Sequence, residues 1–74
     1  MIENRVKGAI WSYFFRLCPE ASSLTVERVD LDTLNKGSAV LKIQRGDIHD
    51  IIEVLWENDR ERIRVKDYSL VAVA

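Results

Sequence analysis

Four basic side chains recur at every second position near the C-terminus: Arg60, Arg62, Arg64 and Lys66. Alternate residues of an extended strand point to the same face, so these cations would line one face about 6.6 Å apart. That interval is close to the phosphate spacing along a nucleic-acid strand, and arginine binds phosphate oxygens well. Acidic residues are interspersed nearby: Glu53, Glu57, Asp59 and Glu61. A solvated face of weak ion pairs is therefore the plainer interpretation, and nucleic-acid or anion binding is the alternative.

A second set of residues is suited to protein contact. Apolar residues over positions 2–17 follow the spacing of one helical face: Ile2, Val6, Ala9, Ile10, Tyr13, Phe14 and Leu17. Trp11, Phe15 and Cys18 form a second apolar column beside that face. Such a helix has to be covered from two sides. We expect a second chain to cover Trp11, Phe15 and Cys18, because aromatic anchors dominate protein interfaces.

Two other arrangements could cover the same column. A second helix of the same subunit could cover it through Trp56. The helix could also lie on a membrane surface, but its basic residues do not share one face and Glu3 and Glu20 flank it. We therefore expect no membrane partner.

Catalytic chemistry finds little support in the sequence. His49 precedes Glu53 by four residues, which on a helix would pair an imidazole with a carboxylate, yet one histidine makes a poor zinc site. Cys18 follows a helix end, whose dipole disfavours a thiolate. Neither a glycine-rich phosphate loop nor a CxxC pair occurs. The sequence predicts a non-enzymatic protein with no catalytic residues, no cofactor and no metal.

The first half of the chain predicts one helix and two strands. The helix over residues 2–17 should end by Cys18, because Pro19 disfavours helical geometry in the preceding residue. Residues 24–31 and 38–44 read as strands joined by a hairpin at Asn35-Lys36-Gly37. Val26 and Val29 lie three positions apart, which breaks strict alternation and suggests a bulge or a helical turn.

The second half predicts a second helix and two more strands. Five apolar residues after the N-cap candidate Asp47 have helical spacing: Ile48, Ile51, Ile52, Leu55 and Trp56. Residues 60–66 alternate as a half-buried strand. A turn at Lys66-Asp67 leading to a final strand over residues 68–73 is slightly favoured over one long strand that bends there.

These elements predict a small two-layer α+β domain spanning residues 1–74, with the order α-β-β-α-β-β. Two helices would pack on one face of a mostly antiparallel sheet. At 74 residues the core is small, which favours a homodimer or another protein partner. We expect a protein-interaction or regulatory module, self-associating through its first helix.

Net charge and cysteine content bear on the possible partners and on the cellular location. Eleven basic and 12 acidic residues give a net charge of -1, so no overall field attracts nucleic acid. A single cysteine excludes an internal disulfide and favours the cytoplasm. The apolar stretch near the N-terminus is interrupted by Arg16, which does not suit a signal sequence.

Overall fold

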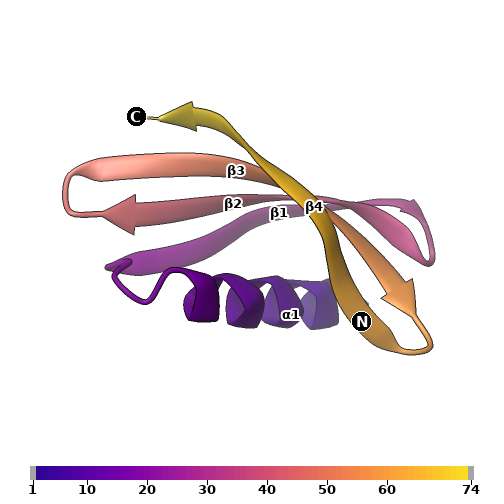
Figure 1. Cartoon of the computed structure of the whole chain (residues 1–74). Helices are drawn as coiled ribbons and strands as arrows, with labels where there is room; N and C mark the ends of the chain where they lie inside the picture. The colour runs from indigo at the N-terminus through magenta and orange to yellow at the C-terminus, as the bar shows by residue number, and fades with distance from the viewer. Residues whose placement is uncertain (1, 74) are drawn as a thin grey trace.

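The computed structural model describes residues 2–73, which form one helix and four strands. Their bounds are α1 Ile2–Leu17, β1 Ser23–Thr33, β2 Lys36–Arg45, β3 Ile48–Asp59 and β4 Arg62–Val73. The strands make one antiparallel sheet in the order β1-β2-β3-β4, so each strand pairs with its neighbours in sequence. Helix α1 lies along one face of this twisted sheet, which gives a small two-layer α+β domain (Figure 1).

Helix α1 confirms the first predicted element. Its buried residues, Val6, Ile10 and Phe14, follow the spacing of one helical face and point at the sheet. The helix ends at Leu17, and the amide of Cys18 still donates to the carbonyl of Phe14 at 2.9 Å. Pro19 then cannot supply the next backbone donor, so the chain leaves the helix there.

The β1–β2 hairpin is also confirmed, but its turn is Leu34-Asn35, and Lys36 and Gly37 of the predicted turn already belong to β2. Its strands end at Thr33 and resume at Lys36, and the Asn35 amide donates to the Thr33 hydroxyl at 3.1 Å. The predicted irregularity is a bulge, because the β1–β2 register shifts between Val26 and Arg28. The extra residue lets Val26 and Val29 share the helix-side face despite their spacing of three.

The predicted second helix is wrong: residues 48–59 form β3. The helical spacing of its apolar residues is a coincidence, and buried Val54 falls outside that helical stripe. As a strand, the segment turns Val54 and Trp56 toward α1 and leaves Glu53 and Leu55 on the other face. Its isoleucines and valine favour a pleated sheet.

Asp47 accordingly is not a helix cap. It lies in the β2–β3 turn after Gly46, whose φ of 60° is a left-handed conformation that suits glycine. The favoured hairpin at Lys66-Asp67 is wrong as well, because β4 runs unbroken from Arg62 to Val73. A register shift leaves Lys66 as the extra residue of a bulge, so the alternative of one long bent strand is correct. The element order is therefore α-β-β-β-β.

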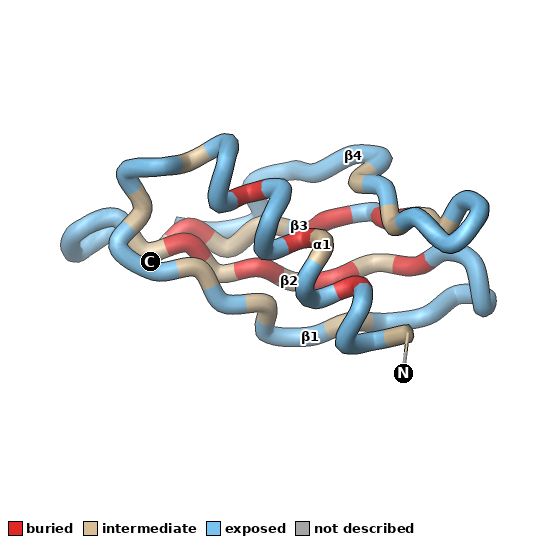
Figure 2. Tube along the Cα trace, turned by 90° about the horizontal axis from the view of Figure 1, so that it is seen from below, coloured by how far each residue is buried: buried red, intermediate tan, exposed pale blue. Residues whose placement is uncertain are grey.

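The core lies between α1 and the centre of the sheet (Figure 2). Its fully buried side chains alternate along the two central strands and meet the helical stripe: Val6, Ile10, Phe14, Ala39, Leu41, Ile43, Val54 and Trp56. The Trp56 indole N–H donates to the Ser38 carbonyl at 2.9 Å, so the largest core side chain also satisfies its polar atom. In the described part of the chain, nothing covers the opposite sheet face.

Candidate functional site

Trp11 and Phe15 form an exposed aromatic pair on α1. Their ring centroids lie 4.8 Å apart with planes inclined by 29°, so the rings are stacked. Trp11 is 45% exposed and Phe15 is 47% exposed. Ser12 and Arg16 line the same shallow hollow, which opens to solvent. We refer to Trp11 and Phe15 as the aromatic pair.

The helix geometry explains why the sheet leaves this pair uncovered. Ile10 and Phe14 point into the core, and each is followed directly by a member of the pair. Successive residues of an α-helix are turned by about 100°, which carries Trp11 and Phe15 away from the sheet. A single sheet can cover one stripe of a helix, and the second apolar column is left at its side.

Trp56 does not cover the aromatic pair. The single-subunit arrangement required Trp56 to sit on a second helix beside α1, but Trp56 lies on β3 beneath α1 and is 1% exposed. The third residue of the predicted interface, Cys18, is half-buried and packs against the core as a free thiol. The structure thus places Trp11 and Phe15 together at the surface and turns Cys18 inward.

The predicted basic row lies on β4 and in the β3–β4 turn. Arg62 and Arg64 point away from α1 on β4, Lys66 is at the bulge, and Arg60 is in the turn between β3 and β4. Acidic residues neutralise half of the row: Arg64 pairs with Asp59 at 3.5 Å and Lys66 pairs with Glu57 at 3.2 Å. Among residues 2–73, Arg60 and Arg62 have no such partner.

The β3–β4 turn is held in an uncommon backbone conformation. Arg60 and Glu61 both have positive φ, 52° and 66°, in the two-residue turn where Asn-Gly is preferred. Arg5 of α1 donates a hydrogen bond to the Glu61 carbonyl and ties this turn to the start of the helix. A hollow beside the turn is lined by Asp59, Arg60, Arg62, Ile63 and Arg64.

The possible acid–base pair of His49 and Glu53 does not form. Both residues lie on the sheet face away from α1. Four residues of extended strand separate them by about 13 Å, too far to share a proton or a metal. Across residues 2–73 no cluster of three or more His, Cys, Asp or Glu residues could hold a metal ion.

One exposed apolar surface, at the end of β4, is not predicted by the sequence patterns. The last part of β4 projects Leu70, Val71 and Val73 to solvent, while Tyr68 still packs its ring 5.0 Å from that of Phe14. In Figure 1 this part of the strand crosses away from α1. The run from Tyr68 to Val73 has no charged residue, and this is the one sequence feature that could have indicated an apolar surface here. Its exposure depends on the strand order, which the local pattern does not reveal.

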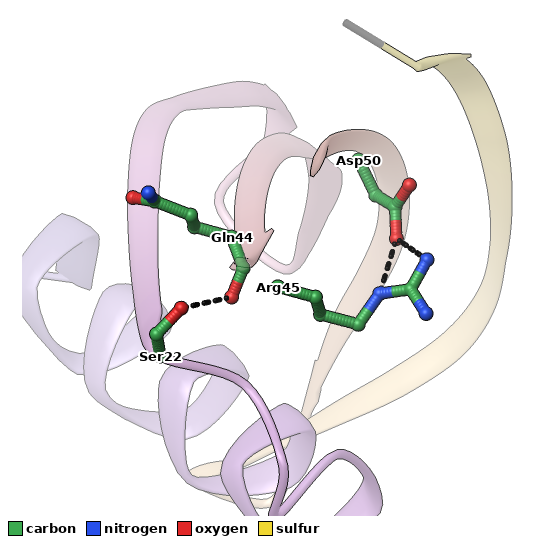
Figure 3. A network of polar contacts seen from close by, with 4 residues as sticks. All are labelled: Ser22, Gln44, Arg45 and Asp50. Atoms are coloured by element: carbon green, nitrogen blue, oxygen red, sulfur yellow. Dashed lines mark hydrogen bonds and ion pairs between the residues drawn. The ribbon is translucent and has the colours of Figure 1, made fainter. Parts of the chain in front are cut away.

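A polar network closes the end of the sheet where α1 leads into β1 (Figure 3). Two nitrogens of Arg45 donate to one oxygen of Asp50, at 2.8 and 3.1 Å, and Asp50 is nearly buried. The amide and hydroxyl of Ser22 both donate to the carbonyl of Gln44. These contacts fix the loop after α1 and have no evident ligand role.

Comparison with known proteins gives no family: no family model, no curated protein and no solved structure matches this chain. Within residues 2–73, no helix has both the length and the apolar character needed to span a bilayer.

Proposed function

We propose that this chain is a non-enzymatic protein-interaction module that self-associates through the aromatic pair of α1. The observation that carries the proposal is the stacking of two large rings that remain nearly half exposed. Stacking holds each ring in place before a partner arrives, so little side-chain freedom is lost on binding. A reducing cytoplasm suits its unpaired cysteine.

A second copy of the chain is a suitable partner for this surface. The pair is apolar and self-complementary, so a two-fold contact would place rings of one copy against rings of the other without burying a charge. Arg16 lies at the border of the hollow, where its guanidinium can stay solvated while its stem covers an aromatic face. Each aromatic anchor of this kind contributes about 2 kcal/mol or more to binding.

Sedimentation equilibrium tests the proposal with the double variant Trp11→Ala, Phe15→Ala. The weight-average mass should fall relative to the unchanged chain, because the contact loses both anchors. Circular dichroism should stay the same, because neither ring belongs to the core. The urea midpoint should fall only by the stabilisation that association supplies, and it should no longer depend on protein concentration. Equal masses for the two proteins would show that the aromatic pair is not the contact.

Two further variants control the measurement. Leu34→Ala removes an apolar side chain that is 78% exposed in the β1–β2 turn, and should leave the mass unchanged. Phe14→Ala removes a ring that is 1% exposed and should lower the unfolding free energy by about 3–5 kcal/mol. Unfolding by the double variant comparable to that of Phe14→Ala would place the pair in the core and contradict the proposal.

Anion or nucleic-acid binding at the β3–β4 turn is the second candidate. It is favoured by the hollow lined by three arginines, two of which lack an acidic partner in residues 2–73. Against it, Arg64 and Lys66 are already neutralised by Asp59 and Glu57. This interaction would be electrostatic and would weaken steeply with salt.

Fluorescence anisotropy with labelled single-stranded DNA at low ionic strength separates the two candidates. Binding that falls steeply as salt is added, and that Arg60→Glu with Arg62→Glu abolishes, supports the second. The matched control is Lys42→Glu with Arg28→Glu, which changes the charge equally at another part of the sheet. Absence of binding at low salt excludes nucleic-acid binding at the β3–β4 turn.

A further inference from the structure

The C-terminal half of β4 is an uncovered sheet edge without charge. β4 ends the strand order, so one of its sides has no neighbouring strand within the described chain. Residues 68–73 contain no charged side chain, although 31% of the residues of the whole chain are charged. Leu70, Val71 and Val73 are 60%, 63% and 59% exposed. Free backbone donors and acceptors along such an edge pair readily with an added strand.

Charged residues lie along the other exposed edges of the sheet, namely β1 and the first half of β4. The outer strand β1 carries four charged residues: Glu27, Arg28, Asp30 and Asp32. The first half of β4 carries Arg62, Arg64 and Lys66, of which Lys66 is the bulge residue. Charges at these places oppose strand addition, because pairing would remove them from water. The second half of β4 lacks this protection, and its own bulge residue is the apolar Val71.

A hydrogen bond shows which backbone groups face the free edge. The amide of Tyr68 donates to the carboxylate of Asp67 at 2.9 Å, so it points outward and is not bonded to β3. Backbone groups of every second residue point the same way in an antiparallel strand, so those of Leu70 also face outward. Tyr68 and Leu70 are therefore placed to exchange backbone hydrogen bonds with an added strand, which takes over the Tyr68 amide from the exposed Asp67 carboxylate.

We propose that this edge pairs with β4 of a second copy of the chain, antiparallel, about a two-fold axis at Ser69. In this register Tyr68 of each copy lies opposite Leu70 of the other and exchanges backbone hydrogen bonds with it. Both side chains lie on the helix-side face, since they pair with Val54 and Ile52 of β3. An aromatic ring and an aliphatic side chain then pack across the new strand pair.

Charge selects the second copy of β4 over β1 as the occupant. In the two-fold arrangement Asp67 faces Val71, and no charge faces a like charge. Pairing of β4 with β1 of another copy would instead set an apolar run against Glu27, Arg28 and Asp30. It would also be a head-to-tail contact that propagates without closing, whereas the two-fold contact closes as a dimer.

Disulfide trapping tests the register. In a Cys18→Ser background, Ser69→Cys places its thiol opposite its own copy, in a pair without backbone hydrogen bonds, where side chains approach most closely. Mild oxidation should give a crosslinked dimer. Thr25→Cys in the same background is the control, because it is exposed on the other edge strand and should crosslink far more slowly. Equal crosslinking of the two variants would overturn the proposal.

A charge placed on the edge tests the contact itself. Leu70→Lys should reduce the assembly mass measured by sedimentation, while leaving the fold intact because Leu70 is 60% exposed. Leu34→Lys adds the same charge at a residue 78% exposed in the β1–β2 turn and should not reduce it. An unchanged mass for Leu70→Lys contradicts edge pairing.

This contact is distinct from the aromatic pair, and the variants separate the two. If β4 pairs, Ser69→Cys still crosslinks when Trp11→Ala and Phe15→Ala are added. Loss of mass by the α1 double variant with no crosslinking at Ser69 would support the aromatic contact and overturn edge pairing. A chain that is monomeric in every measurement would contradict both.

Discussion

Trp56 lies directly across the β2–β3 pair from Gly37, and its indole occupies the space that a side chain on Gly37 would need. A Cβ at position 37 would lie 2.9 Å from Cζ2 of Trp56 and 2.0 Å from the carbonyl oxygen of Asp30. The backbone contact cannot relax by rotating a side chain. The absence of a side chain at Gly37 therefore lets β1 and Trp56 approach the same point of β2.

Gly37→Ala should lower the free energy of unfolding by about 1–3 kcal/mol, because overpacking here displaces backbone. Urea unfolding followed by tryptophan fluorescence measures the effect, because unfolding exposes the buried Trp56. Gly8→Ala is the control, because a Cβ there meets nothing within 4 Å and alanine favours a helix interior, which should add about 0.5–1 kcal/mol. Equal stability of the two variants would mean that Gly37 has space to spare.

The β3–β4 turn should become more stable when its sequence suits its backbone. In Arg60 and Glu61 the left-handed conformation costs about 1 kcal/mol each, and asparagine and glycine tolerate it better. Arg60→Asn with Glu61→Gly should therefore raise the free energy of unfolding by about 1–2 kcal/mol. The Arg5 hydrogen bond survives, because Arg5 donates it to the backbone carbonyl of residue 61 and not to the Glu61 side chain. Thermal and urea unfolding provide the measurement.

Gly46→Ala should change stability in the opposite direction, in the β2–β3 turn at the other end of β3. Gly46 has φ of 60°, and a Cβ there meets no atom within 4 Å, so the loss of stability isolates the backbone cost of about 1 kcal/mol. A stabilising Gly46→Ala, or a destabilising Asn-Gly turn, would contradict the described turn conformations.

Arg45→Ala should lower the free energy of unfolding by about 1–3 kcal/mol, because it strands the nearly buried carboxylate of Asp50 without its two hydrogen bonds. Arg28→Ala breaks an ion pair of similar length to Asp30, but both of those side chains are exposed, and less than about 1 kcal/mol should be lost. Chemical unfolding at neutral pH compares them. Equal losses would indicate that Asp50 is solvated.

Local patterns predicted the elements that depend on neighbouring residues. The stripe through Val6, Ile10 and Phe14 and the stop at Pro19 defined α1, and the spacing of Val26 and Val29 revealed the β1 bulge. These features follow from side-chain period and backbone geometry, which a short segment carries by itself.

β3 was missed because two periods fit its apolar residues. Its outward Ile51 and Leu55 complete a helical stripe with Ile52 and Trp56, although the sheet assigns them to opposite faces. Pairing with β2 and β4 decided the outcome, and such pairing is non-local. β-Branched content and the off-stripe Val54 were the contrary signals.

The two candidate surfaces also differ in whether local sequence patterns predict them. Helical spacing predicts the second apolar column of α1, and with it the aromatic pair. Helical spacing also predicts Cys18 in this column, but α1 ends at Leu17 and Cys18 packs against the core instead. The β4 edge required knowledge of which strand is outermost.

The connection of every strand to its sequence neighbour has a consequence for how the chain folds. Each hairpin forms by closing a short loop, so the contact order of the sheet is low and little entropy is lost before pairing begins. The Arg5 contact with Glu61, by contrast, joins groups 56 residues apart. We expect the strands to pair first and the start of the helix to dock after the rate-limiting step, so that loss of the Arg5 contact speeds unfolding and leaves the folding rate unchanged.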